Sequence, residues 1–383
     1  MKRVALYYPW IYVQSGVERT IIETVRRSRH HYTIFTNHYD RAQTYPDFAD
    51  LTDLVELRRI GVRRTFLDAL DAVGTICLQR LPLSDFDLLL VHSEGAGDFL
   101  TLRNHDRPVL CYCHSLQRPI YDPVYRETLL ESKPHYRVPL ACLEPLYRLA
   151  TRAAWRHYEH VFVNSEETRR QVAAAGLCPP ERMETLHPGV ALERIHPSLT
   201  YAPFFLYAGR IKWTKNVELA IGAFLEFRRV HPRGADWKLI VAGDVDRHSG
   251  TYLQRLRALA DGESAVEFRM KPSDADLAAL YDRCSALLFP SLSEPWGMVP
   301  LEAMAYGKPV LAVGSCGPAE SIRDGETGFL LEPTVPAFAA AMTSLADAPE
   351  RRRRMGEQAR ERAARYSWDH FVTRLDEYIE QHC

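Results

Sequence analysis

Two consecutive series of short apolar segments, each followed by a helical pattern, extend along most of the 383-residue chain. The first series comprises residues 3–8, 32–37, 86–93, 108–115 and 160–165. The second comprises residues 204–210, 238–244, 266–269, 286–291, 309–313 and 328–333. Because each segment is nearly continuous in apolar residues, it is typical of a parallel strand that is covered on both faces. The two series predict an α/β fold with two doubly wound domains that face each other across a cleft.

The segments between the strands support this division of the chain. Helical apolar spacing occupies residues 216–230, 251–261 and 273–284. In the last of these, Ser273 and Asp276 stand in capping-box order. Residues 186–203 are rich in proline and have no clear period. We therefore place the boundary there, with an N-terminal domain over 1–195 and a C-terminal domain over 196–365.

The overall composition excludes several functional classes. A net charge of −1 gives no indication of nucleic-acid binding. The eight cysteines include no CxxC pair, which favours reduced thiols in a cytoplasmic protein over a disulfide framework or a zinc site. Pro9 breaks the first apolar run, which predicts a strand and not a signal peptide. No stretch approaches the roughly 18 apolar residues that a membrane span needs.

Two glutamates near the end of the second series form the first candidate site. Glu294 follows the strand-like segment 286–291, and Pro300 fits the first turn of a helix that contains Glu302. The N-terminus of such a helix offers unpaired N–H groups to a phosphate. Carboxylates on either side of that phosphate can accept hydrogen bonds from sugar hydroxyls. The same spacing is equally consistent with a capping glutamate and a solvent-facing one, so both interpretations stay open.

Two cations follow another predicted strand. Gly209 and Arg210 stand at the end of the segment 204–210, and Lys215 comes five positions after Arg210. An arginine and a lysine on one loop can neutralise a diphosphate, and a departing nucleoside diphosphate develops the negative charge that such cations stabilise. Taken alone, the pair is also typical of ordinary surface cations.

Several stretches together resemble the signature of the retaining glycosyltransferases of family 4. They are GRxxxxK at 209–215, SEPWGMVPLEAMAYGKPVLA at 293–312, CGPAESIRDGETGFLLEP at 316–333, SGVERT at 15–20 and CYCHS at 111–115. The likeness is strong from about residue 204 to 333. Ser15 and Asn216 stand where many relatives have glycine. The resemblance implies the GT-B architecture of two Rossmann-like domains, in which a last helix, 366–383, crosses back onto the N-terminal domain.

The resemblance also implies roles for individual residues. Arg210 and Lys215 would bind the diphosphate, Glu302 the ribose hydroxyls, and Glu294 the hydroxyls of the transferred sugar. From the N-terminal domain, His114 would hydrogen-bond the sugar. The implied catalytic residues are Glu294, His114, Arg210 and Lys215. The implied donor-binding residues are Gly16, Gly209, Arg210, Lys215, Glu294, Trp296, Gly297, Met298, Val299 and Glu302, with backbone N–H groups acting at Gly16 and around Gly297.

The implied reaction moves a hexose, with retention of configuration, from a GDP-mannose-type or UDP-hexose donor to a hydroxyl of a glycan, glycolipid or small molecule. It needs no cofactor or metal. Front-face attack and a covalent intermediate both stay open. For Glu294 we favour hydroxyl binding over nucleophilic attack, because a diphosphate would repel an attacking carboxylate beside it. The alternatives are a non-catalytic sugar-nucleotide-binding subunit, an epimerase and a phosphorylase.

Acceptor residues are expected in the N-terminal domain. Tyr8 and Trp10 follow the first strand and could line an acceptor site or pack in the core. Arg118, near the histidine, resembles a loop of mannosyltransferases. Residues 58–83 combine arginines with Phe66, Leu67, Leu70 and Val73. This stretch is typical either of peripheral contact with an anionic membrane, at its cytoplasmic face, or of a packed helix with one wet face, which we favour.

Three further patterns are discounted. Asp244 and Asp246 resemble a metal-binding Asp-x-Asp, but they follow a strand where a turn explains them. Cys111 and Cys113 would share one face of a strand, and no second pair completes a metal site. Gly95 and Gly97 lack the third glycine of a dinucleotide fingerprint.

Overall fold

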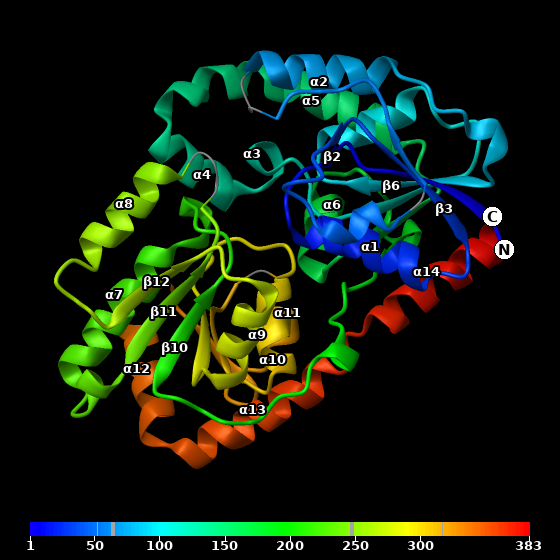
Figure 1. Ribbon diagram of the computed structural model, residues 1–383. Coiled ribbons are helices and arrows are strands. Elements are labelled where there is room, and N and C mark those ends of the chain that lie inside the picture. Colours follow the sequence, from blue (N-terminus) through cyan, green and yellow to red (C-terminus); the bar gives the residue numbers. More distant parts are fainter. Residues whose placement is uncertain (52, 63–65, 246–248, 316) are drawn as a thin grey trace. The chain divides into compact units, whose positions relative to one another are not determined.

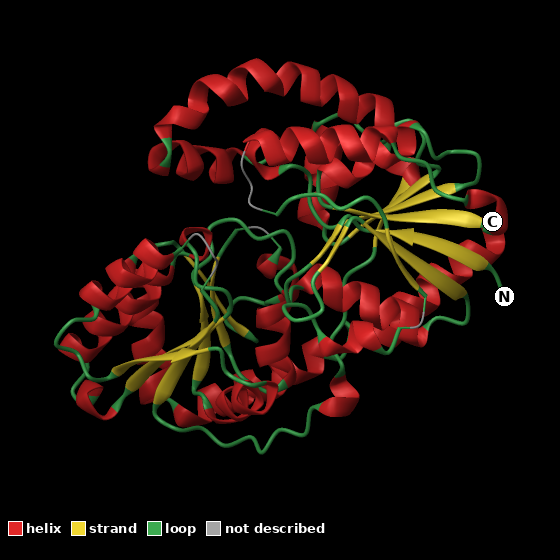
Figure 2. Cartoon of the chain, turned by 45° about the horizontal axis from the view of Figure 1, so that its top comes forward, coloured by secondary structure: helices red, strands yellow, loops and turns green. Residues whose placement is uncertain are grey.

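The structure is a computed structural model, and it describes residues 1–51, 53–62, 66–245, 249–315 and 317–383 (Figure 1). The chain forms two compact units. Unit 1 comprises Met1–Gly189 and Trp368–Cys383, and unit 2 comprises Val190–Ser367. The sequence places the domain limits at 195/196 and 365/366, whereas the units change at 189/190 and 367/368. Each unit has its own parallel sheet, with helices on both faces (Figure 2).

The seven-stranded sheet of unit 1 has the order β5-β3-β1-β6-β7-β8-β9. Its strands are β1 Arg3–Tyr7, β3 His31–Thr36, β5 Leu54–Glu56, β6 Leu88–Ser93, β7 Val109–Cys113, β8 His160–Val163 and β9 Met183–Thr185. A separate pair is formed by β2 Trp10–Ile11 and β4 His38–Tyr39. All paired strands run parallel, and the strand order reverses between β1 and β6. Ligand sites of doubly wound sheets lie at such a reversal, beyond the carboxyl ends of the strands.

The helices of unit 1 include one from the C-terminal end of the chain. They are α1 Gly16–Arg27, α2 Phe66–Leu78, α3 Arg118–Tyr121, α4 Pro123–Ser132, α5 Arg137–Trp155, α6 Glu166–Ala174 and α14 Trp368–His382. In α14, Trp368, Phe371 and Leu375 are buried, and Arg374 donates two hydrogen bonds of 2.7 Å to Glu184. The last helix therefore packs on the N-terminal sheet, as the resemblance implies.

Helix α2 lies in the stretch for which membrane contact was one interpretation. Ala72 and Ile76 are buried in the core of unit 1, whereas Leu70 and Leu78 are exposed. The side chains of Phe66 and Leu67 fall outside the described residues. The described part of α2 thus has one face packed against the core and one face exposed to solvent. Of the helices in the described ranges, none combines the length and the apolarity needed to cross a bilayer.

The six-stranded sheet of unit 2 has the order β12-β11-β10-β13-β14-β15, again with every pair parallel. Its strands are β10 Phe204–Ala208, β11 Lys238–Gly243, β12 Val266–Met270, β13 Ala286–Phe289, β14 Val310–Val313 and β15 Gly328–Leu331. Its helices are α7 Val217–Val230, α8 Gly250–Leu259, α9 Asp274–Arg283, α10 Met298–Ala305, α11 Pro318–Ser321, α12 Val335–Asp347 and α13 Pro349–Ala363. Here the strand order reverses between β10 and β13.

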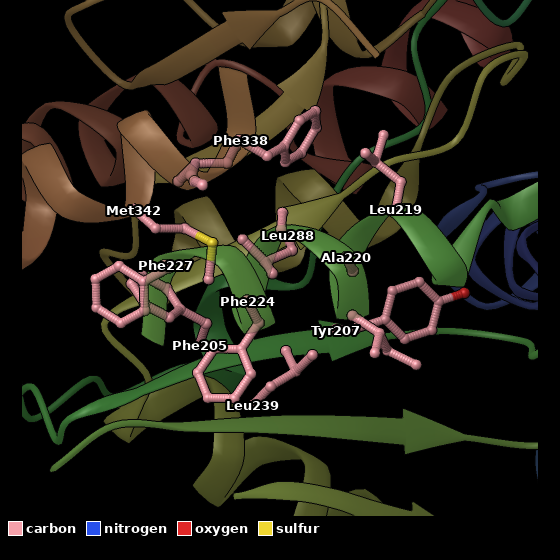
Figure 3. Close-up of a cluster of buried hydrophobic side chains, with 14 of the residues drawn as sticks. Phe205, Tyr207, Leu219, Ala220, Phe224, Phe227, Leu239, Leu288, Phe338 and Met342 are labelled. Atoms are coloured by element: carbon pink, nitrogen blue, oxygen red, sulfur yellow. The ribbon is translucent and has the colours of Figure 1, made fainter. Parts of the chain in front are cut away.

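Burial on both faces of the unit 2 sheet explains its continuous apolar segments. On one face, Phe205 and Leu239 pack against Phe224 and Phe227 of α7 and Met342 of α12 (Figure 3). On the other face lie the residues Leu206, Ile240, Leu287, Leu301 and Met304. Successive strand residues therefore alternate between two cores, and neither face tolerates polar side chains. The predicted capping box of α9 is also present, with Ser273 and Asp276 each bonded to the other's backbone N–H.

Candidate active site

The candidate site in unit 2 lies where the strand order reverses. β10 pairs with β11 at five residues, but with β13 only at Phe205 and Leu206. Beyond Leu206 the two central strands are no longer paired, so the loops after β10 and β13 leave the sheet on separate courses. Arg210 and Lys215 follow β10, and Glu294 follows β13. All three candidate residues therefore lie at the carboxyl edge of the sheet, at its reversal point.

Backbone packing fixes the start of the loop that carries Arg210. Gly209 has a φ of 133° and Gly243 one of 153°, and a Cβ on Gly243 would lie 1.9 Å from the carbonyl oxygen of Gly209. The hydroxyl of Tyr207 donates to the Arg210 carbonyl at 3.0 Å. Arg210 is half-buried, and no described acidic side chain lies within ion-pair distance of its guanidinium. The backbone at Arg210 is thus fixed, and its guanidinium has no acidic partner among the described residues.

Lys215 ends a short turn, Trp213–Lys215, that leads into α7. The next residue, Asn216, has φ 49° and ψ 47°, a left-handed conformation that glycine and asparagine adopt most readily. Asparagine can therefore occupy this position, at which the resemblance leads one to expect glycine. The ammonium of Lys215 pairs with the carboxylate of Glu294 and lies 5.5 Å from the centre of the Phe289 ring. The two predicted loops therefore meet through opposite charges.

The loop of Glu294 is held in a narrow space before α10. The carbonyl of Glu294 accepts from Gly317 N at 2.9 Å, and a Cβ on Gly317 would lie 2.1 Å from the Pro295 carbonyl oxygen. Gly297 precedes the helix with a φ of 101°. Because α10 begins at Met298, its first backbone N–H groups have no partner within the helix and can bind an anion. Glu294 lies in the loop and Glu302 lies inside α10, as the spacing predicts.

The side chain of Trp296 has a structural position in this loop. It is 3% exposed, and its ring packs edge-on against Tyr366 at 5.2 Å between centroids. Met298 and Val299 are half-buried at the start of α10. A ligand in front of α10 would thus be reached by the backbone of these residues and not by the indole.

Glu302 is oriented by a tyrosine that the sequence analysis does not single out. The hydroxyl of Tyr281, on α9, donates to Glu302 Oε2 at 2.9 Å. The Tyr281 ring stacks on Tyr306 with centroids 5.5 Å apart. Burial, and then the charge of Glu302, raise the pKa of Tyr281 well above its usual value, so it remains a hydrogen-bond donor. In sequence, Tyr281 is one more apolar position of an amphipathic helix, and nothing there distinguishes it from a packing residue.

Replacing Tyr281 with phenylalanine should weaken nucleotide binding by about tenfold, because a hydrogen bond to a charged group is typically worth 1.5–3 kcal/mol. Calorimetric titration with a nucleoside diphosphate measures the effect. A 2′,3′-dideoxy nucleotide is the control, since it lacks the hydroxyls that Glu302 would bind. We expect it to bind the wild type and Tyr281→Phe equally. An equal loss for both nucleotides would show that Tyr281 only supports packing.

The candidate residue of unit 1, His114, follows β7 and is paired with a second histidine. His114 Nε2 lies 2.9 Å from Nδ1 of His92, at the end of β6, and the His114 carbonyl accepts from Asn164 Nδ2 at 2.8 Å. His92 is 1% exposed and His114 6%. Burial lowers the pKa of His92 to about 3, and burial together with His92 lowers the pKa of His114 well below its usual value. Both rings are therefore neutral near pH 7.

Hydrogen bonding indicates the tautomer of this pair. His92 Nε2 is buried and has no partner among the described residues. A buried N–H without a partner costs more than a buried lone pair, because the donor has lost its water. The proton of His92 is thus favoured on Nδ1, where it is donated to His114 Nε2. His114 then carries its own proton on Nδ1 and acts as a donor there.

His92 should make the protein sensitive to mild acid. Its folded pKa, about 3, lies below the unfolded value of 6.5, so the unfolded state binds the proton first and stability falls as pH drops below 6.5. Between pH 6.5 and 5 this amounts to about 2 kcal/mol. In urea unfolding of unit 1, the wild type should lose about that much more over this interval than His92→Gln. Parallel pH curves for the two proteins would contradict the assignment.

The other predicted residues of unit 1 take more varied positions. Gly16 is the first residue of α1, and Ser15 caps this helix by accepting from Val17 N at 3.3 Å. Tyr8 is 4% exposed and donates to Glu94 at 3.0 Å, which links the loops after β1 and β6 at the reversal point. Trp10 is half-buried in β2, and Arg118 forms an ion pair with Asp122 at 3.2 Å.

The described residues contain no group of three or more His, Cys, Asp or Glu side chains that could hold a metal ion. The main chain of Asp244 accepts from Ile211 N at 2.7 Å, and Asp246 lies outside the described residues. Cys111 and Cys113 are both buried on β7.

Comparison with known proteins places both units in one family. Residues 14–194 match the family described as Glycosyltransferase Family 4, and residues 192–362 match Glycosyl transferases group 1. The chain is 30% identical over 233 residues to a D-inositol 3-phosphate glycosyltransferase of Streptomyces scabiei, covering 56% of this chain and 52% of that protein. It thus spans about half the length of that relative. It is 24% identical to the alpha-1,3/1,6-mannosyltransferase ALG2 of Rhizomucor pusillus, covering 97% of this chain and 90% of that protein.

Solved structures share the fold over the whole chain. Anabaena HepE, crystallised with UDP and glucose, superposes with a TM-score of 0.75 at 17% identity, covering 99% of this chain and 100% of that one. Sucrose-phosphate synthase from Thermosynechococcus elongatus gives a TM-score of 0.76 at 19% identity, covering 100% and 99%. These likenesses confirm the predicted fold class of two Rossmann-like domains. With two parallel sheets, the site loops in place and both family matches, this chain belongs to the GT-B glycosyltransferases of family 4.

Proposed function

We propose that the chain is a retaining hexosyltransferase that moves a hexose from a nucleotide-diphosphate sugar to a hydroxyl of a glycan, glycolipid or small molecule in the cytoplasm. The observation that carries the proposal is the cluster at the reversal point of unit 2. There, Lys215 pairs with the loop carboxylate Glu294 just before the N-terminus of α10, Arg210 lies on the same loop as the lysine, and a second carboxylate, Glu302, lies inside the helix. This arrangement matches an anionic diphosphate between two hydroxyl-bearing sugars.

The charge and position of each site residue in unit 2 suggest its role. Arg210 and Lys215 hold the diphosphate and stabilise the charge that develops as it leaves. The free N–H groups at the start of α10, from Gly297 to Val299, add hydrogen bonds to the same anion. Glu302, oriented by Tyr281, accepts from the ribose hydroxyls. Glu294 accepts from hydroxyls of the transferred hexose, once its ion pair with Lys215 has opened to admit the diphosphate.

In this proposal, residues of unit 1 bind the transferred sugar and the acceptor. His114 donates from Nδ1 to the transferred sugar, in the tautomer set by His92. Because both rings are neutral, His114 binds by hydrogen bonding and does not act as a charged acid. Gly16, at the start of α1, places backbone N–H groups near the phosphate or the acceptor, and Arg118, Tyr8 and Trp10 contribute to the acceptor side. No cofactor or metal enters the reaction.

The donor is a GDP-mannose-type sugar or a UDP-hexose. One relative is named a mannosyltransferase, which favours the first, and HepE was crystallised with UDP and glucose, which favours the second. Thermal unfolding in the presence of each sugar nucleotide distinguishes them, because a ligand that binds only the folded state raises Tm. Turnover with the stabilising donor should yield a product that keeps the donor's anomeric configuration, as read from the one-bond carbon–proton coupling at C1. An inverted product, or no stabilisation by any sugar nucleotide, would contradict the proposal.

A further inference from the structure

The turn that carries Lys215 is held on both sides by hydroxyl groups of other elements. On the N-terminal side, the buried Ser291, from the loop after β13, donates to the carbonyl of Thr214 at 3.2 Å. On the C-terminal side, the hydroxyl of Tyr252, on α8, accepts from Val217 N at 2.9 Å. Val217 is the first residue of α7. The main chain is therefore held one position before Lys215 and two positions after it.

These outside contacts matter because the turn itself is short. It spans three residues, and its main-chain hydrogen bonds include one from Lys215 N at 2.9 Å and one from Asn216 N at 3.1 Å. A single turn is weak on its own, because fixing its dihedral angles costs more free energy than so few hydrogen bonds provide. The hydroxyls of Ser291 and Tyr252 supply contacts that the turn cannot supply for itself.

The hydroxyl of Tyr252 uses both of its hydrogen-bonding functions at the start of α7. Besides accepting from Val217 N, it donates to the carboxylate of Glu218, in the first turn of that helix. Helices α7 and α8 pack side by side, which brings the phenol to this position (Figure 1). Burial, and then the hydrogen bond to Glu218, raise the pKa of Tyr252 above its usual value, so the hydroxyl stays protonated. It therefore remains a donor and an acceptor at any working pH.

We propose that Ser291 and Tyr252 are positioning residues that hold Lys215 where its ammonium meets the leaving diphosphate. This role rests on the proposed function. A lysine side chain is flexible, so the region that its ammonium can reach depends on where the main chain is fixed. Electrostatic catalysis requires that placement in advance, and an error of about 1 Å can cost a large part of the rate. Ser291 also lies 3.4 Å from Glu294 Oε2, so the same hydroxyl can keep the carboxylate in place when Lys215 leaves it.

Steady-state kinetics of Tyr252→Phe and Ser291→Ala tests the proposal. Each substitution should lower kcat by about tenfold, because the ammonium of Lys215 is no longer preorganised for the charge that develops on the diphosphate. The KM for the donor should change less than kcat, since that charge is largest in the transition state. Thermal unfolding midpoints should fall no further than those of the controls.

The chain offers a matched control for each substitution at the opposite edge of the same sheet. Tyr201 precedes β10, is half-buried like Tyr252, and donates its hydroxyl to a main-chain carbonyl at 3.0 Å. Ser285 precedes β13, is buried like Ser291, and also donates to a main-chain carbonyl, at 2.8 Å. Tyr201→Phe and Ser285→Ala should leave turnover near that of the wild type. If the site variants were as active as these controls, the positioning role would be refuted.

A double-mutant cycle shows whether the effect passes through the lysine. In the Lys215→Met protein, Tyr252→Phe should lower kcat by less than about twofold, because there is no ammonium left to position. A residue that only supports folding would lower kcat by the same factor in both backgrounds, and that result would overturn the proposal. Wild-type turnover in Lys215→Met itself would refute the proposed role of the lysine, and the positioning role with it.

Discussion

Replacing Lys215 with methionine should lower the rate of sugar transfer by about 10²–10³-fold, the range found when one preorganised electrostatic contact to a developing charge is removed. Lys215 ends the turn before α7 and is followed by the left-handed Asn216, and its ammonium pairs with Glu294 of the loop that follows β13. The diphosphate gains negative charge as the glycosidic bond breaks, so the lysine stabilises the transition state more than the bound donor. Arg210→Gln should have an effect of similar size for the same reason.

The matched control for Lys215→Met is Lys238→Met. Lys238 also forms an ion pair with a glutamate, Glu267, at 2.6 Å, but it starts β11 at the amino edge of the same sheet. Loss of this exposed pair should change turnover by less than about threefold, because surface ion pairs contribute little. Steady-state kinetics with the identified donor compares the variants. Equal rates for Lys215→Met and Lys238→Met would exclude the proposed role of the lysine.

Glu294→Gln should lower turnover by about a hundredfold while leaving the affinity for the free nucleoside diphosphate unchanged or slightly higher. The first effect follows from weakened hydrogen bonds to the hydroxyls of the reacting sugar. The second follows from the structure, because the Glu294 carboxylate pairs with Lys215 and competes with a diphosphate for it. Without that negative charge, the ammonium of Lys215 is available to bind the diphosphate.

The substitution Glu302→Gln should distinguish the role of Glu302 from that of Glu294. Its main effect should be weaker nucleotide binding, since the Tyr281 hydroxyl holds the Glu302 carboxylate at the proposed ribose position. For each variant, calorimetric titration with a nucleoside diphosphate measures the nucleotide affinity, and kinetics at saturating donor measures the turnover rate. Glu267→Gln is the control for charge alone. If Glu294→Gln lowered nucleotide affinity as much as Glu302→Gln, the assigned division of labour would be wrong.

The strands and the site loops could be predicted because their physical requirements appear directly in the sequence. A parallel strand buried on both faces requires a continuous apolar run, so 204–210 and 286–291 correspond to β10 and β13. The residues just after such runs stand at the carboxyl edge of the sheet. The sequence alone therefore predicts that Arg210 and Glu294 lie at the carboxyl edge of the sheet.

Other features could not be predicted because they depend on contacts between distant segments. β5 and β9 are three residues each, too short to show a period, and pairing with β3 and β8 defines them. Tyr281 and His92 meet Glu302 and His114 from neighbouring elements, 21 and 22 positions away in the chain. In sequence each is one residue within an apolar segment.

All the proposed roles require the leaving diphosphate to lie at the reversal point of the unit 2 sheet. A crystal structure of the protein with its stabilising sugar nucleotide tests this claim most directly. We expect phosphate oxygens within hydrogen-bond distance of Arg210 and Lys215, with the ribose hydroxyls on Glu302. A nucleotide bound elsewhere, with Lys215 still paired to Glu294, would contradict it.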